Sequence, residues 1–175
     1  EPPVRSGRLG VVGATVGCVA GLFAVGTARL DTRLGAWFAG ALPGVTSSVP
    51  RSRRGDVWIA QGSSGSFAFH ITASCASMWP LAALLVVAAA AVALTARRIP
   101  VGATAGGLIA ACVALVLGNA IRTAVVSSAV AEWGTGSLVV THDSVGAVFG
   151  LLVFAFAVVV GIVCTRRLTG TRACA

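Results

Sequence analysis

The chain has 175 residues, of which 57% are hydrophobic and 10% are charged, and its net charge is +8. Such a composition excludes an ordinary soluble domain and is typical of an integral membrane protein in contact with membrane lipid. All 13 basic residues are arginines, and most of them lie at the ends of apolar runs, as topology determinants do. Because aromatic residues are not interleaved with these arginines, we do not expect nucleic-acid binding.

The first expected membrane span covers residues 9–28 and follows Arg5 and Arg8. Three of its glycines, at positions 13, 17 and 21, recur every four residues. Small residues at this period let another helix approach closely, so the sequence predicts a packing seam along one face of the span.

Residues 29–77 are expected to form an outer segment between the first two spans. Residues 34–42 predict a short interfacial helix that carries Trp37 and Phe38 and ends at Pro43-Gly44. Residues 57–72 surround a Gly-Ser-rich centre, and apolar side chains alternate after it. This pattern predicts a hairpin-like loop, with the Gly-Ser centre as a flexible turn.

Three further spans are expected at residues 78–96, 102–131 and 144–164. The sequence therefore predicts an all-α integral membrane protein, a single domain over residues 1–175 built as a bundle of about four transmembrane helices. Arginine clusters at positions 5 and 8, 97 and 98, and 166, 167 and 172 then share the cytoplasmic side. Five arginines in the outer segment run against this orientation, but long outer segments are weakly governed by the positive-inside rule.

Asn119 and Arg122 interrupt the apolar sequence of the expected span at residues 102–131. An ionisable residue at membrane depth costs about 2.5–3.5 kcal/mol on insertion scales, so it normally faces the bundle interior and marks a functional site. The two residues are three positions apart, which places them on one helix face. This face is the centre of the predicted site.

Cys75 and His142 are expected at the same depth as Arg122, because each immediately precedes a span and Arg122 lies about two turns below the outer end of its own. The other cysteines fall mid-span or on the cytoplasmic side, at positions 18, 112, 164 and 174. An imidazole can take the proton of a thiol and return it to a leaving amine, and a fixed cation can stabilise the oxyanion. These residues thus suit cysteine acyl transfer, with Asn119 orienting the guanidinium.

In these residues the chain resembles the exosortase and archaeosortase transpeptidases of bacterial and archaeal membranes. The resemblance covers residues 69–150 and rests on three motifs in order: Cys75 at the head of a span, Asn119-Ala120-Ile121-Arg122 within the next, and His142-Asp143-Ser144-Val145-Gly146 entering the one after. The family usually has Ser or Thr and then Gly after the cysteine, where this chain has Ala76 and Ser77, and it commonly has more spans.

The resemblance implies a membrane cysteine protease and transpeptidase at the extracytoplasmic face of the cell membrane, without a cofactor. Its protein substrate would carry a C-terminal sorting signal made of a short motif, a transmembrane helix and a basic cluster. Cys75 would be the nucleophile, Arg122 the transition-state stabiliser and His142 the acid and base. Gly146 and Gly150 would allow a neighbouring helix, such as that of the substrate, to approach.

Other interpretations stay open at this point. His70 lies five residues before Cys75 and competes with His142 for the role of base. The histidines and cysteines have no metal-ligand spacing, so we expect no metal site. A non-enzymatic assembly subunit, in which Arg122 and Asn119 pair with a partner helix, is the main alternative; a transport path through Arg122 and His142 is a third.

Overall fold

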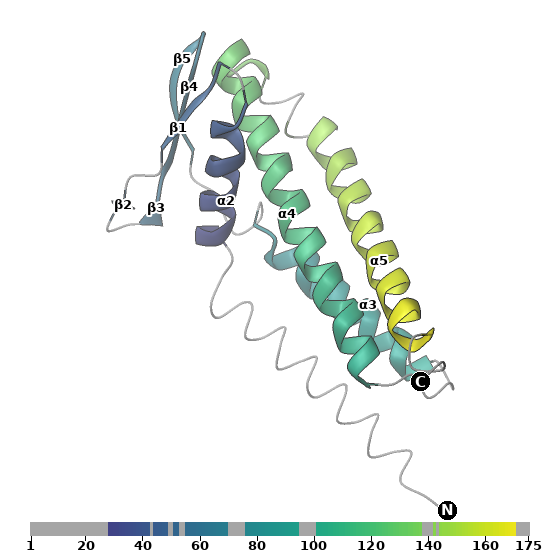
Figure 1. Ribbon diagram of the computed structural model, residues 1–175. Helices are drawn as coiled ribbons and strands as arrows, with labels where there is room; N and C mark the ends of the chain where they lie inside the picture. Colours follow the sequence, from purple (N-terminus) through teal and green to yellow (C-terminus); the bar gives the residue numbers. More distant parts are fainter. Residues whose placement is uncertain are drawn as a thin grey trace, which may run out of the picture.

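The computed structural model describes residues 28–42, 44–48, 51–52, 55–69, 76–94, 101–137, 142 and 144–170. It is mostly helical, and a small antiparallel sheet lies at one end (Figure 1). The first predicted span, with its glycine seam, lies outside the described residues except for Ala28. The prediction of an all-α chain was wrong in one respect, because it left out the sheet.

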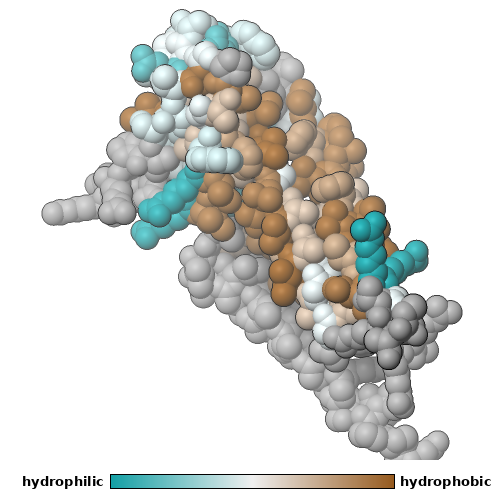
Figure 2. All heavy atoms as spheres, in the orientation of Figure 1, coloured by the Kyte–Doolittle hydropathy of each residue, from teal (hydrophilic) through white to brown (hydrophobic). Residues whose placement is uncertain are grey.

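Two long helices, α4 (Val101–Trp133) and α5 (Gly146–Gly170), lie side by side and antiparallel (Figure 1). Both are long and apolar enough to cross a membrane. The third apolar helix, α3 (Met78–Leu94), has 17 residues and is shorter. All three match predicted spans in position, and Figure 2 shows an apolar surface along the long helices with hydrophilic residues towards both ends.

Glycines set the distance between α4 and α5. A Cβ atom on Gly107 would lie 2.6 Å from the carbonyl oxygen of Gly161, and one on Gly118 would overlap the side chain of Val153. Helices lacking side chains at such points can pack backbone against backbone. The seam that holds the long pair together therefore uses these glycines.

Helix α2 (Ala28–Gly40) packs against the half of α4 that is nearer the sheet, while α3 lies along the other half (Figure 1). The buried residues of α2 recur at helical spacing. They are Asp31, Thr32, Gly35, Ala36 and Ala39. The predicted interfacial helix is thus present, but it begins six residues earlier than residue 34.

The sheet is built around a hairpin of β4 (Trp58–Gly62) and β5 (Gly65–Phe69), which confirms the predicted hairpin. Strand β1 (Thr46–Ser48) pairs antiparallel with β4, and β2 (Arg51–Ser52) and β3 (Gly55–Asp56) form a separate two-stranded ribbon. Trp58 is fully buried and packs on Phe69, with ring centroids 5.8 Å apart. It anchors the sheet on α2 and α4.

The hairpin turn binds the C-terminal end of α4. Ser63 donates a hydrogen bond from its hydroxyl to the Glu132 carboxylate over 2.7 Å, and the Ser64 hydroxyl donates to the Glu132 carbonyl over 2.6 Å. The Ser64 amide also donates to the Ala131 carbonyl over 3.0 Å. Because the last carbonyls of a helix lack partners within the helix, this turn caps α4. The Gly-Ser sequence is an ordered cap, which the prediction of a flexible turn did not foresee.

Candidate functional site

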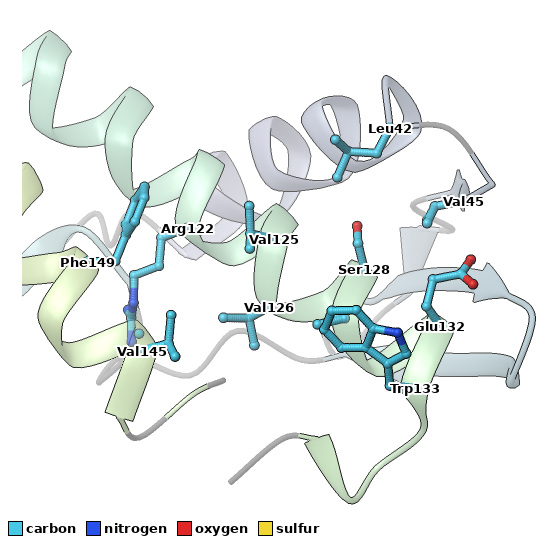
Figure 3. A pocket seen from close by; sticks show the side chains of 12 residues that line it. Leu42, Val45, Arg122, Val125, Val126, Ser128, Glu132, Trp133, Val145 and Phe149 are labelled. Carbon is cyan, nitrogen blue, oxygen red and sulfur yellow. The ribbon is translucent and has the colours of Figure 1, made fainter. Parts of the chain in front are cut away.

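Arg122 lies on α4 about three turns before the helix ends at Trp133. Its side chain extends from α4 towards the beginning of α5, where Val145 lies (Figure 3). Its Nε atom is buried, and no described residue accepts a hydrogen bond from it. A buried donor without an acceptor is costly and rare in proteins, so this Nε atom marks Arg122 as a residue that packing alone does not explain.

Arg122 lines two cavities. The upper cavity, of about 530 Å³, lies between α4, the end of α2 and the start of α5, and it is drawn in Figure 3. The lower cavity, of about 570 Å³, is formed by α3, α4 and α5, and Trp79, Pro80 and Asn119 are among its lining residues. The guanidinium is therefore placed between two hollows that are otherwise mainly apolar.

Asn119 shares the helix face of Arg122, as predicted, and both residues line the lower cavity. It is 7% exposed, and its backbone carbonyl oxygen accepts a hydrogen bond from the Thr123 hydroxyl over 2.8 Å. Asn119 does not accept from the Nε atom of Arg122, because that atom has no partner. The expected orientation of the guanidinium by Asn119 is thus not made through Nε.

His142 is half-buried, and Ser144 and Val145, which share its π-helical conformation and lead into α5, are exposed. Val145 and Gly146 line the upper cavity together with Arg122. The structure thus brings Arg122 to the same cavity as the turn that contains His142.

Cys75 and His70 lie outside the described residues. Ala76 and Ser77, which follow Cys75, are both buried, and the first turn of α3 after them contributes Trp79 and Pro80 to the lower cavity. The chain immediately after the predicted nucleophile therefore borders the second hollow beside Arg122.

Sequence reasoning missed Asp31, which is fully buried and holds Ser77. The Ser77 amide and hydroxyl donate to the two carboxylate oxygens over 2.7 and 2.6 Å. The Ser77 carbonyl accepts the first helical bond of α3, from Leu81, so Ser77 is the residue that caps α3. The one available signal was that only 5 residues of this chain are acidic, and Asp31 lies in the first turn of a helix.

Among the described residues, no group of three or more His, Cys, Asp or Glu side chains is placed to hold a metal ion. Cys112 and Cys164, which are described, are half-buried thiols on α4 and α5. Neither residue lines a cavity with Arg122.

Comparisons with known proteins give no relative: no family model, no curated protein and no solved structure matches the chain.

Proposed function

We propose that the chain is an integral membrane cysteine transpeptidase of the exosortase and archaeosortase type, which cleaves C-terminal sorting signals. The observation that carries the proposal is that Arg122 lines two cavities and that its buried Nε atom has no acceptor among the described residues. One cavity is bordered by the turn that follows Cys75 in the sequence, and the other by the turn that contains His142. A preorganised donor in an apolar site is what stabilisation of an oxyanion requires.

In the proposed reaction, His142 accepts the proton of Cys75, and the thiolate attacks the carbonyl carbon of the scissile peptide bond. Arg122 hydrogen-bonds the oxyanion of the tetrahedral intermediate. The intermediate collapses, the carbon–nitrogen bond breaks, and His142 returns the proton to the leaving amine. The remaining thioester is then attacked by a nucleophilic group of the acceptor, which releases the Cys75 thiol and completes the transfer.

The proposed membrane arrangement has about four spans, with both termini in the cytoplasm and the site near the outer surface of the cell membrane. It is supported by the apolar lengths of α4 and α5 and by the arginines that follow the apolar part of α5. The sheet lies beside α2 and the C-terminal end of α4, at the end of the molecule opposite these arginines (Figure 1), where an outer cap on the bundle would be expected.

The substrate helix is proposed to approach along the glycines at the start of α5. Gly146 lines the upper cavity and Gly150 the lower one. A Cβ atom on Gly150 would meet no other atom within 4 Å, so this glycine is not used for packing α4 against α5. It leaves space for another helix beside Arg122.

The second candidate function is a non-enzymatic assembly subunit, in which an acidic side chain of a partner helix pairs with Arg122. The same residue supports it, because a guanidinium whose Nε atom has no acceptor among the described residues can be given one by another chain. The two candidates differ in what they require of Cys75, since only acyl transfer needs the thiol.

The test is co-expression with a secreted reporter that ends in a randomised six-residue segment, a transmembrane helix, an arginine cluster and an epitope tag. Loss of the tag is compared for wild type, Cys75→Ala, Arg122→Ala and His142→Ala, with Cys112→Ala as the matched control for a thiol remote from the cavities. We expect cleaved clones with wild type and Cys112→Ala but not with the first three variants. Cleavage by Cys75→Ala at the wild-type rate would exclude the mechanism and favour the assembly subunit.

A further inference from the structure

A further cavity lies between α3 and the two long helices, at the end of α5 that carries Arg166. It has a volume of about 340 Å³, and Arg122 does not line it. At the end remote from Arg166 lie Leu84 and Ala111, which are buried in the packed apolar cluster of the three helices. We call this cavity the α3 groove, because it follows α3 from Leu84 to Ala91.

The α3 groove has the length and direction of a lipid acyl chain. Along α5 it extends from Val158 to Arg166, which is eight residues or about 12 Å. Half of the hydrocarbon core of a bilayer is about 15 Å thick, and helices that cross the bilayer hold the groove across one leaflet. An acyl chain in the groove would therefore run in the same direction as the chains of the surrounding lipid.

The lining of the groove suits an aliphatic occupant. Its polar residues are Thr104, Thr165 and Arg166, all at the mouth, and the other lining residues are apolar or glycine. A bound water needs about two to four polar partners, which most of the groove does not offer. A helix is about 10–12 Å across and would have to push α3 away from α4 and α5. An aliphatic chain needs neither polar partners nor such a width.

The mouth of the groove favours a negative headgroup. Arg166 is the charged residue of the lining and is exposed. A long arginine side chain covers apolar surface with its stem and keeps its guanidinium among the headgroups. The carboxylates of the described residues belong to α2, the sheet and the opposite end of α4, and are those of Asp31, Asp56 and Glu132. Basic pockets between transmembrane helices at the cytoplasmic surface bind anionic lipid headgroups, and the proposed orientation places Arg166 at that surface.

We propose that the α3 groove binds one acyl chain of an anionic phospholipid and that Arg166 holds the phosphate of its headgroup. The lipid then fills the space between α3 and the two long helices. The proposal goes beyond the transpeptidase reaction and does not rest on it, because it requires only that these helices cross a membrane. A chain that cleaves no reporter can still bind the lipid, so the two proposals fail independently.

The test uses the full chain in phosphatidylcholine vesicles that contain a trace of photoactivatable phospholipid. The probe carries a diazirine at the end of one acyl chain, has either a phosphatidylglycerol or a phosphatidylcholine headgroup, and its adducts are mapped by mass spectrometry. We expect the phosphatidylglycerol probe to label the deep end of the groove, at Leu84, Ala111 or Val158, about fivefold more than the other probe does. Equal labelling by the two probes, or adducts spread evenly over the exposed faces of α4 and α5, would overturn the proposal.

Two pairs of variants test the headgroup and the chain separately. Arg166→Gln should remove the preference for phosphatidylglycerol, whereas Arg167→Gln, at an exposed residue outside the lining, should keep most of it. Ala88→Trp places a large side chain in the groove and should lower labelling of the deep end by both probes. Ala90→Trp, at an exposed residue outside the lining, should not. Equal losses in the two arginine variants, or wild-type labelling of Ala88→Trp, would overturn the proposal.

An excess of soluble glycerol phosphate decides whether the anion binds without the acyl chain. Because the chain occupies most of the groove, we expect glycerol phosphate to leave the labelling by phosphatidylglycerol unchanged. A fall to the level of the phosphatidylcholine probe would show that a free phosphate takes the site at Arg166, and it would overturn the proposal of a lipid.

Discussion

Asp31 binds both hydrogen-bond donors of Ser77, the backbone amide over 2.7 Å and the hydroxyl over 2.6 Å, and both residues are fully buried. The pair joins the first turn of α2 to the cap of α3, two elements separated by more than 40 positions in the chain. Ser77 is also two residues after Cys75. The carboxylate therefore fixes the chain that leaves the proposed nucleophile, and it does so with hydrogen bonds of the stronger, charge-assisted kind.

Replacing Asp31 should unfold this junction. Asp31→Ala leaves two buried donors of Ser77 without an acceptor, and we expect the free energy of unfolding to fall by about 3 kcal/mol. Ser77→Ala, which removes only the hydroxyl, should cost about half as much. Unfolding by denaturant in detergent micelles measures both, and an Asp31→Ala variant as stable as wild type would contradict the assignment.

The Asp31→Asn variant separates the effect of Asp31 on the position of the segment around Cys75 from its effect on the stability of the fold. The amide keeps one acceptor oxygen for Ser77 but loses the charge, so the fold should persist while the cap of α3 is held less firmly. We expect the rate at which a membrane-impermeant thiol reagent labels Cys75 to change, while labelling of Cys112 stays slow. Equal Cys75 labelling in both proteins would show that Asp31 does not position this segment.

Replacing Arg122 should affect activity more than stability, in contrast to replacing Asp31. Because no described residue accepts a hydrogen bond from its buried Nε atom, Arg122→Met removes an unsatisfied donor of a half-buried side chain and should leave the stability unchanged or raise it by about 1–2 kcal/mol. Cleavage of the reporter should be lost. Arg122→Lys keeps the charge but not the planar fork, so it should recover only part of the activity. A marked loss of stability in Arg122→Met would mean that the residue has a structural role.

The elements with a strong local pattern were predictable from the sequence. The apolar runs predicted α3 and α4 to within about two residues at each end, and the Gly-Ser centre at residues 62–66 with the alternation after it predicted the hairpin. Helix α5 continues six residues past the predicted end at Cys164, because arginine stops an apolar run without stopping a helix. Helix α2 begins six residues before the predicted residue 34. Its first turns carry charged residues, so a prediction based on apolar runs does not include them.

The contacts that shape the site were not predictable in this way. Asp31 reaches Ser77, and Ser63 reaches Glu132, across long stretches of chain. Periodicity reports which face of an element is apolar, but it does not say which polar side chain meets which. Arg122 and Asn119 could be found because a polar residue inside an apolar run is costly.

Two glycines with opposite surroundings provide a test of the proposed docking of a substrate helix. Gly107→Val would force a side chain against the backbone of Gly161, so we expect the α4–α5 pair to separate and the protein to be lost from the membrane fraction. Gly150→Val enters open space and should leave the folded protein at its wild-type level. It should nevertheless block cleavage of the reporter, because it narrows the approach to Arg122.

Gly136 provides the control for the second of these variants, since a Cβ atom there also meets nothing within 4 Å and the residue lines neither of the cavities beside Arg122. Gly136→Val should be folded and fully active. If Gly150→Val were folded and cleaved the reporter as wild type does, the substrate helix would have to dock elsewhere.

The cap of α4 by the hairpin turn should stabilise the end of the helix that borders the upper cavity. Glu132→Ala removes the carboxylate acceptor of the Ser63 hydroxyl and leaves it only the Glu132 backbone carbonyl, 3.0 Å away. We expect a loss of at most about 1 kcal/mol in unfolding free energy, with faster hydrogen exchange in the last turn of α4. Glu132→Gln keeps an acceptor oxygen and should lose less. Ser66→Ala, on the exposed strand β5, is the control and should match wild type. Because Glu132 and Trp133 line the same cavity as Arg122, loosening the last turn of α4 should also lower reporter cleavage. Hydrogen exchange at the wild-type rate in Glu132→Ala would show that the cap does not order the helix end.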